Sequence, residues 1–246
     1  MSATVAGHNS RDSQHASHDG ASPETWPRCE ITPIERALEA DDRLIMAHDP
    51  RDPRCEKIRA LRTELLLRRE SPDRADIVAL LSPCAGEGRS LLAAELAIAF
   101  AQTGRPTLLV DADLRRPQQH LLFGTDNRQG LSQAIASGVK PNLRAVHGLP
   151  RMSVLTAGAV PSNPLELLSS SGFASMVEDW RDTFEFVVID TAPVMQFSDG
   201  LAVANFVGRV LTLSRAQHTS YKDMQDMLRR LAATRSQILG AVISHF

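Results

Sequence analysis

Short aliphatic runs alternate with helical segments along most of this chain. Six such runs, DIVALLS, RPTLLVDAD, MSVLTAG, FEFVVIDTAP, RVLTLSR and QILGAVIS, follow one another between residues 76 and 244. Continuous apolar runs of this length are typical of parallel strands that are buried on both faces. Helical stretches, including residues 91–101, 165–180 and 221–234, lie between them. The pattern predicts an α/β fold with a mostly parallel sheet, helices on both faces, and a ligand site at the carboxyl ends of the strands.

The same pattern divides the chain into three parts. Residues 1–30 are rich in Ser, His, Asp and Gly and poor in large aliphatic side chains, which predicts a disordered N-terminal tail. Residues 31–54 carry a mixed signal and end in the turn-rich DPRDPR, so we expect a linker there. The remaining residues, 55–246, form the predicted domain, which begins with a helix over CEKIRALRTELLLRR.

Composition narrows the class of protein. The chain has 246 residues and a formal net charge of −2, so it has no bias toward nucleic acid. Its three cysteines form no CxxC pair, which favours a reducing compartment over a disulfide scaffold. The N-terminus lacks a secretory signal pattern, and no run reaches the roughly 18 apolar residues of a membrane span. We therefore expect a cytoplasmic protein whose association with a membrane depends on a partner.

The first predicted strand leads into a candidate phosphate-binding loop. DIVALLS is followed by the turn PCAGEG and by the helical RSLLAAELAIAF. Backbone N–H groups of a glycine-rich turn and of the helix that follows can form a concave site for phosphate oxygens, and Ser90 stands where a hydroxyl would bind Mg²⁺. The pattern G-x-x-x-x-G-K-[ST] is met in part, because Pro83 replaces the first glycine and Arg89 replaces the lysine. The alternative is a plain turn between a strand and a helix.

Acidic residues end two other predicted strands. RPTLLVDAD ends in Asp111 and Asp113, and FEFVVIDTAP contains Asp190. Because the carboxyl ends of parallel strands meet at one edge of a sheet, we expect all three carboxylates to lie near the phosphate loop, where they could hold Mg²⁺. The alternative for each residue alone is a loop position or a helix cap.

Five motifs in order resemble those of the bacterial tyrosine kinase (BY-kinase) family, the P-loop enzymes of capsule and exopolysaccharide assembly. They are SPCAGEGRS, LLVDADLRRPQQHLLFG, QGLSQAIASG, VLTAGAVPSNPLELLSS and FVVIDTAPV. The resemblance runs from about residue 56 to residue 244 and implies a P-loop NTPase-like fold, transferase activity, and the use of ATP and Mg²⁺.

The resemblance also implies roles for individual residues. The catalytic candidates are Arg89, Asp111 and Asp113, and the candidate Mg²⁺ ligands are Ser90, Asp111, Asp113 and Asp190. The candidate nucleotide-binding residues are Ala85, Gly86, Glu87, Gly88, Arg89, Ser90 and Leu91. Glu56, Arg59 and Arg62 match the family's E-x-x-R-x-x-R motif, which joins neighbouring subunits into a ring; the alternative is a solvated helix face.

Two features depart from the family pattern. Arg89 replaces a compact lysine charge with a planar fork of different reach, so we expect nucleotide binding to survive while turnover falls about a hundredfold, the effect of misplacing one transition-state donor. The family's clustered C-terminal tyrosines are also missing, since only His245 and Phe246 follow the last predicted strand. Self-phosphorylation on such a tail is therefore not expected.

These features leave three hypotheses for function. The first is an ATP-binding tyrosine-kinase-like protein that regulates capsule or exopolysaccharide synthesis and export. The second is a nucleotide-dependent assembly regulator with weakened catalysis, and the third is an assembly ATPase of the cell-division or DNA-partition type. For the first we expect a separate membrane-bound chain-length or export protein as partner, a homo-oligomeric ring, and no nucleic acid.

Overall fold

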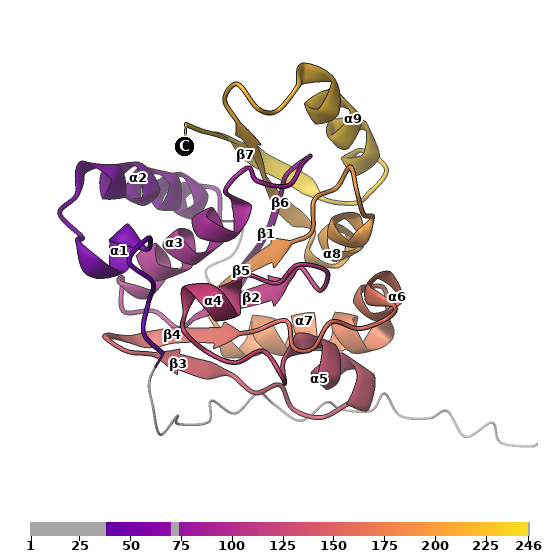
Figure 1. Cartoon of the computed structure of the whole chain (residues 1–246), viewed down its shortest axis with the longest axis horizontal. Coiled ribbons are helices and arrows are strands. Elements are labelled where there is room, and N and C mark those ends of the chain that lie inside the picture. Colours follow the sequence, from indigo (N-terminus) through magenta and orange to yellow (C-terminus); the bar gives the residue numbers. More distant parts are fainter. Residues whose placement is uncertain (1–37, 70–73, 246) are drawn as a thin grey trace, which may run out of the picture.

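Seven strands form one sheet in the order β3-β4-β2-β5-β1-β6-β7 in this computed structural model, which describes residues 38–69 and 74–245 (Figure 1). In chain order the strands are β1 (Asp76–Leu81), β2 (Thr107–Ala112), β3 (Arg144–Val146), β4 (Leu149–Leu155), β5 (Phe186–Thr191), β6 (Arg209–Arg215) and β7 (Gln237–Ser244). Only β3 runs antiparallel to its neighbour. The predicted α/β fold with a mostly parallel sheet is therefore confirmed. The short β3, which carries no long apolar run, was not predicted.

Helices cover both faces of the sheet (Figure 1). One face carries α1 (Ile45–His48), α2 (Pro53–Leu67), α3 (Arg89–Ala101) and α4 (Gln119–Leu122), and the other carries α5 (Leu131–Ser137), α6 (Pro164–Leu168), α7 (Ser171–Thr183), α8 (Asp199–Val207) and α9 (Tyr221–Leu231). Each face has its own apolar core, because both sides of the central strands are buried. None of these helices, in the part of the chain that the structure describes, is long and apolar enough to cross a membrane.

The stretch predicted as one helix over residues 165–180 is two helices. It breaks after α6, and Ser170 caps the start of α7 by accepting a hydrogen bond from the N–H of Phe173 at 3.3 Å. A serine side chain satisfies an N–H that would otherwise have no partner at a helix start, so the Ser169–Ser170 pair favours a boundary here.

Residues 38–52, which fall within the predicted linker, pack against α3. The side chains of Leu44 and Met46 are fully buried. The carboxylate of Glu95 accepts hydrogen bonds from the N–H groups of Ile45 and Met46 at 2.7 and 3.0 Å. The predicted tail, residues 1–30, and residues 31–37 of the predicted linker lie outside the described residues.

The central strands bring the sequence-predicted acids to one edge of the sheet. In the register of β2 and β5, Asp111 lies opposite Asp190, and in the register of β1 and β5, Asp190 lies opposite Leu80. The loop that follows β1 begins at the same edge. Candidate site residues separated by about a hundred positions in the sequence therefore meet at the carboxyl ends of three adjacent strands.

Candidate functional site

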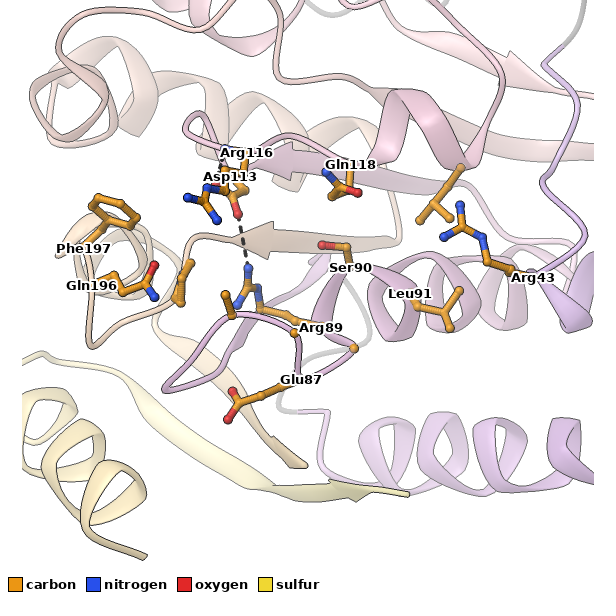
Figure 2. Close-up of a pocket in the computed structure, with 15 residues that line it drawn as sticks. Arg43, Glu87, Arg89, Ser90, Leu91, Asp113, Arg116, Gln118, Gln196 and Phe197 are labelled. Carbon is orange, nitrogen blue, oxygen red and sulfur yellow. Dashed lines mark hydrogen bonds and ion pairs between the residues drawn. The ribbon is translucent and has the colours of Figure 1, made fainter. Parts of the chain in front are cut away.

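The loop between β1 and α3 forms one wall of a cavity of about 400 Å³. Gly86 and Gly88 adopt φ angles of 77° and 87°, which are left-handed conformations that favour glycine. Figure 2 shows the residues around this cavity. All seven predicted nucleotide-binding residues, from Ala85 to Leu91, line it, together with Arg43, Asp113, Arg116, Gln118, Leu122, Pro193, Gln196 and Phe197. The start of α3 lies at this cavity, and the first N–H groups of a helix, which lack intrahelical partners, can bind an anion.

Arg89 turns inward from the loop and is paired with two carboxylates. Its Nε donates to Oδ1 of Asp190 at 3.1 Å, and its Nη2 donates to Oδ2 of Asp113 at 3.3 Å. Its Nη1 donates to the hydroxyl of Ser82 at 2.6 Å. Only 7% of Arg89 is exposed. The guanidinium therefore offsets the charge of two predicted site carboxylates in a buried position.

The three acidic residues lie at different depths. Asp113 lines the cavity, whereas Asp111 and Asp190 are fully buried beneath it. Oδ1 of Asp111 accepts the N–H of Asp113 at 3.1 Å, and its Oδ2 accepts those of Gln118 and Gln119 at 3.0 and 2.9 Å. Asp111 therefore holds the turn that presents Asp113, while Asp113 is the carboxylate that faces the cavity.

Burial changes the acidity of both aspartates that follow β2. Loss of solvent raises the pKa of Asp111 well above its usual range, and the nearby charge of Asp190 adds to this effect. Burial also raises the pKa of Asp113, although the N–H of Arg116 and the charge of Arg89 oppose the shift. A carboxylate with a raised pKa is a stronger proton acceptor than one in solvent.

Gln119 is a site residue that the sequence reasoning missed. Its Nε2 donates to Oδ2 of Asp190 at 2.9 Å and to the carbonyl oxygen of Ser90 at 3.0 Å, so it connects the end of β5 with the start of α3. Its Oε1 is buried and has no partner among the described residues. A glutamine six positions after Asp113, in a segment with no clear periodicity, gives no signal of such a role.

The sequence also gave no sign of the hydrogen bonds that hold the carbonyl groups of the phosphate loop. Arg215 donates to the carbonyl oxygen of Gly86 at 3.1 Å, and Ser244 Oγ donates to that of Glu87 at 3.0 Å. The carboxylate of Glu87 accepts the N–H of Cys84 at 3.0 Å and the hydroxyl of Thr219. The loop from β6 to α9 and the end of β7 thus fix the backbone of the phosphate loop. Figure 2 shows the Glu87 carboxylate pointing away from Asp113.

Arg115 and the ring of Phe197 are in contact at the border of the cavity. Arg115 donates through Nε to Oδ2 of the fully buried Asp199 at 2.7 Å, and its guanidinium lies 4.2 Å from the centroid of the Phe197 ring. Arg116 and Phe197 both line the cavity. A cation over an aromatic face and a buried ion pair together restrict the position of Phe197.

The oxygen groups at the cavity fit Mg²⁺. Ser90 and Asp113 line the space, and Asp190 lies below them, held by Gln119 and Arg89. Hydroxyl and carboxylate oxygens are the ligands that Mg²⁺ prefers, and it usually keeps several waters and takes others from a substrate phosphate. Within residues 38–69 and 74–245, no group of three or more His, Cys, Asp and Glu side chains is arranged to hold a metal by itself. The unpartnered Oε1 of Gln119 could accept a hydrogen bond from a water bound to Mg²⁺.

The E-x-x-R-x-x-R residues lie on α2, and the structure does not bring them to this cavity. Glu56 pairs with Arg59, which also donates to the carbonyl oxygen of Pro50. Arg62 donates through Nη1 to the carbonyl oxygen of Ala99 at 2.8 Å and so ties α2 to α3. Glu56 remains 71% exposed at its side chain.

Comparison with known proteins gives consistent relatives, although no family model matches the chain. Tyrosine-protein kinase YwqD of Bacillus subtilis is 33% identical over 205 residues, which cover 82% of this chain and 85% of that protein. Tyrosine-protein kinase etk of Escherichia coli K12 is 32% identical over 197 residues, which cover 80% of this chain and 27% of that protein. The chain therefore spans nearly all of some relatives and about a quarter of others.

Solved structures agree with the sequence relatives. The chimerical protein CapA2B2 superposes with a TM-score of 0.78 at 30% identity, covering 87% of this chain and 94% of that one. The kinase domain of the Escherichia coli tyrosine kinase ETK also gives a TM-score of 0.78, at 29% identity, covering 87% and 84%. The cell-division ATPase MinD of Pyrococcus furiosus, at 22% identity and a TM-score of 0.59 over 69% of this chain and 71% of that one, shares the fold alone. From its relatives and its fold, the chain belongs to the bacterial tyrosine kinase family.

Proposed function

We propose that this chain binds ATP with Mg²⁺ and transfers the γ-phosphoryl group to tyrosine, as a kinase that regulates capsule or exopolysaccharide synthesis and export. The observation that carries the proposal is the position of Asp113. This carboxylate faces the same cavity as the glycine loop and Ser90, and it is the one predicted catalytic carboxylate that does so. A phosphate site, a metal-binding hydroxyl and a proton acceptor are the parts that phosphoryl transfer requires.

The residues of the chain would divide the work as follows. N–H groups of the loop around Gly86 and Gly88 would hold the phosphates, and Ser90 with Asp113 and Asp190 would hold Mg²⁺. Bound Mg²⁺ would offset the charge on the phosphate oxygens. Asp113, which faces the cavity, would accept the phenolic proton of the tyrosine, and Asp111 would keep the Asp113 turn in place.

A second function has an observation in its favour. The Arg89 guanidinium donates to Ser82, Asp113 and Asp190, so each of its three nitrogens already has an acceptor within the protein. A nucleotide site with such an arginine would bind ATP and turn it over slowly. In that case the chain would be a nucleotide-dependent regulator whose output is assembly.

The proposal also includes a partner protein for this chain and the compartment in which the chain acts. The solved structure CapA2B2 is of a chimerical protein. The family resemblance implies that the partner of this chain is a separate membrane-bound polysaccharide chain-length or export protein. We propose that this chain is cytoplasmic, is recruited by such a partner, and forms a homo-oligomeric ring. Glu56, Arg59 and Arg62 would contribute to the contact between neighbouring copies.

Transfer of label from radiolabelled ATP to a glutamate–tyrosine copolymer tests the kinase proposal. The comparison is between the wild type and Asp113→Asn, both with Mg²⁺. A kinase should label the copolymer, and the variant should be slower by about a hundredfold or more, since proton transfer and metal placement both suffer. Equal, very slow labelling by both proteins, together with an ATP-dependent change in particle mass, would favour the assembly regulator.

A further inference from the structure

Among the described residues that line the cavity, only Phe197 is aromatic. The other parts of the proposed site bind phosphate, metal or a proton, and none of them recognises an aromatic ring. We propose that the Phe197 ring packs against the phenol ring of the acceptor tyrosine and so determines the preference of this site for an aromatic acceptor. This inference rests on the proposed kinase function and names a specificity-determining residue of that same site.

The Phe197 ring is held in place by its neighbours before any acceptor binds. The guanidinium of Arg115 lies 4.2 Å from the centroid of the ring. That guanidinium donates through Nε and Nη2 to the two carboxylate oxygens of Asp199, at 2.7 and 3.1 Å, and the Asp199 side chain is fully buried. A ring that is already fixed loses little freedom when a second ring packs against it, so more of the contact energy appears as affinity.

The loop that carries Phe197 is fastened to the start of the phosphate loop. The N–H of Val194 donates to the carbonyl oxygen of Ser82 at 3.0 Å. The next N–H, that of Met195, donates to the carbonyl oxygen of Pro83 at the same distance. The backbone on which Phe197 stands therefore keeps a fixed relation to the loop that would hold the phosphates.

Arg115 also connects the Phe197 ring to the proposed proton acceptor. Its N–H donates to Oδ1 of Asp113 at 3.2 Å, while its guanidinium contacts the ring. A tyrosine carries its hydroxyl at the end of the ring that is farthest from the backbone. A phenol ring that packs against Phe197 can therefore direct its hydroxyl toward the Asp113 carboxylate.

The position of Phe197 favours the acceptor over the nucleotide base as the group that meets this ring. In the view of Figure 2, Asp113 lies between Phe197 and Ser90. In phosphoryl transfer the attacking and the leaving oxygens are roughly in line, so acceptor and ADP lie on opposite sides of the transferred group. Ser90 and the start of α3 mark the side of the phosphates and the metal. Phe197, beyond Asp113, is on the side from which an acceptor approaches.

A single substitution of Phe197 separates ring recognition from the other steps. Phe197→Leu removes the ring and keeps an apolar side chain, and Phe197→Trp restores an aromatic face. Phe206→Leu is the matched control, because Phe206 is a half-buried phenylalanine of α8 that does not line the cavity. Each protein is given ATP, Mg²⁺ and a glutamate-rich peptide with one tyrosine, whose acidic flanks suit the exposed Arg116 on the cavity wall. Two unreactive versions of the peptide, with phenylalanine or leucine in place of the tyrosine, serve as competitors.

We expect Phe197→Leu to raise the KM for the tyrosine peptide about two- to tenfold, which is the worth of one aromatic pair, and to leave kcat within about twofold. Phe197→Trp and Phe206→Leu should stay within about twofold of the wild type in both constants. The phenylalanine peptide should inhibit the wild type at a lower concentration than the leucine peptide does, and Phe197→Leu should remove that difference. The ATP-dependent rise in melting temperature should be the same in all four proteins.

Three results would overturn the inference. A labelled peptide with an unchanged KM in Phe197→Leu, or an equal rise in KM in Phe206→Leu, would do so and leave the kinase function standing. A smaller ATP-dependent rise in melting temperature in Phe197→Leu would assign the ring to the nucleotide base instead. Absence of label on the peptide with the wild type would overturn the kinase function and this inference with it.

Discussion

Arg89 Nε donates a hydrogen bond to Asp190 Oδ1 across 3.1 Å, and both side chains are buried. The loop position that usually holds a lysine therefore closes an internal ion pair at the floor of the cavity. A guanidinium is a planar fork that can satisfy several acceptors at fixed angles, whereas an ammonium is a compact charge on a flexible stem. If ATP binds at this loop as proposed, its phosphates and the Asp190 carboxylate would compete for the same cation.

Substitution of Arg89 by lysine should change the stability of the fold and the rate of phosphoryl transfer in opposite directions. Arg89→Lys should lower the free energy of unfolding without nucleotide, because one ammonium cannot reproduce the bonds to Ser82, Asp113 and Asp190. The same change should raise the rate of phosphoryl transfer, because the shorter charge is free to follow the phosphates. Arg89→Gln should lower both, with a stability loss of about 3 kcal/mol from leaving buried carboxylates unpaired. Urea unfolding and labelled ATP transfer measure the two effects. An Arg89→Lys protein with unchanged or lower transfer would show that arginine is the fitted residue here.

Mg²⁺ with ATP should raise the melting temperature through the phosphate loop. A ligand at a hundred times its dissociation constant stabilises the native state by about 2.7 kcal/mol. Gly88→Ala should abolish most of this shift, since a φ of 87° is strained for alanine and the loop N–H groups would move. Gly104→Ala is the matched control, because Gly104 has a similar φ of 81° and does not line the cavity. Loss of the shift in both variants, or no shift in the wild type, would contradict binding at this loop.

The pattern of apolar residues predicted the central strands of this fold, because the residues in those apolar runs are also the buried ones. The runs that became β1, β2 and β5 are buried along their whole length, and continuous apolar residues are the signature of that environment. Glycines and a following helix marked the phosphate loop for a similar local reason. The meeting of Asp111 and Asp190 then followed from parallel order alone.

The features that the sequence did not predict are contacts between segments that lie far apart in the chain. Glu95 bonds to Ile45 over 50 positions, Gln119 to Asp190 over 71, and Thr219 to Glu87 over 132. Each contact depends on one polar side chain meeting a partner through the tertiary fold, so no periodicity announces it. For the same reason, the sequence showed that Arg89 replaces a lysine but could not show which groups it would meet.

The proposed subunit contact on α2 can be tested by reversing one exposed charge. Glu56→Lys should reduce the particle mass seen by light scattering from ring to smaller species, while the melting temperature of the domain changes little. Glu64→Lys is the matched control on the same helix, since Glu64 is 63% exposed and pairs only weakly, at 3.7 Å, with Arg68. Arg62 is unsuitable for this test because it binds the carbonyl oxygen of Ala99 within the chain. A monomeric wild type, or equal dissociation by both charge reversals, would argue against the E-x-x-R-x-x-R contact.

The raised pKa of Asp113 should give the stability of the free protein a pH dependence of known sign. Burial makes the folded state hold the Asp113 proton more tightly than the unfolded state, in which an aspartate has a pKa of about 3.9. The contribution of this group is therefore greatest below that value and is lost as the pH rises through the folded pKa. Asp113→Asn removes the titration, and its Oδ1 can still accept the N–H groups of Arg115 and Arg116. The free energy of unfolding of the variant relative to wild type should thus rise from pH 4 toward neutral pH in urea titrations.

Asp126→Asn is the control with the opposite sign. Its free energy of unfolding relative to wild type should fall over the same pH range, because hydrogen bonds from the backbone and side chain of Arg128 lower the pKa of Asp126. Parallel pH profiles for wild type and Asp113→Asn would show that the Arg89 charge and the backbone donors cancel the effect of burial.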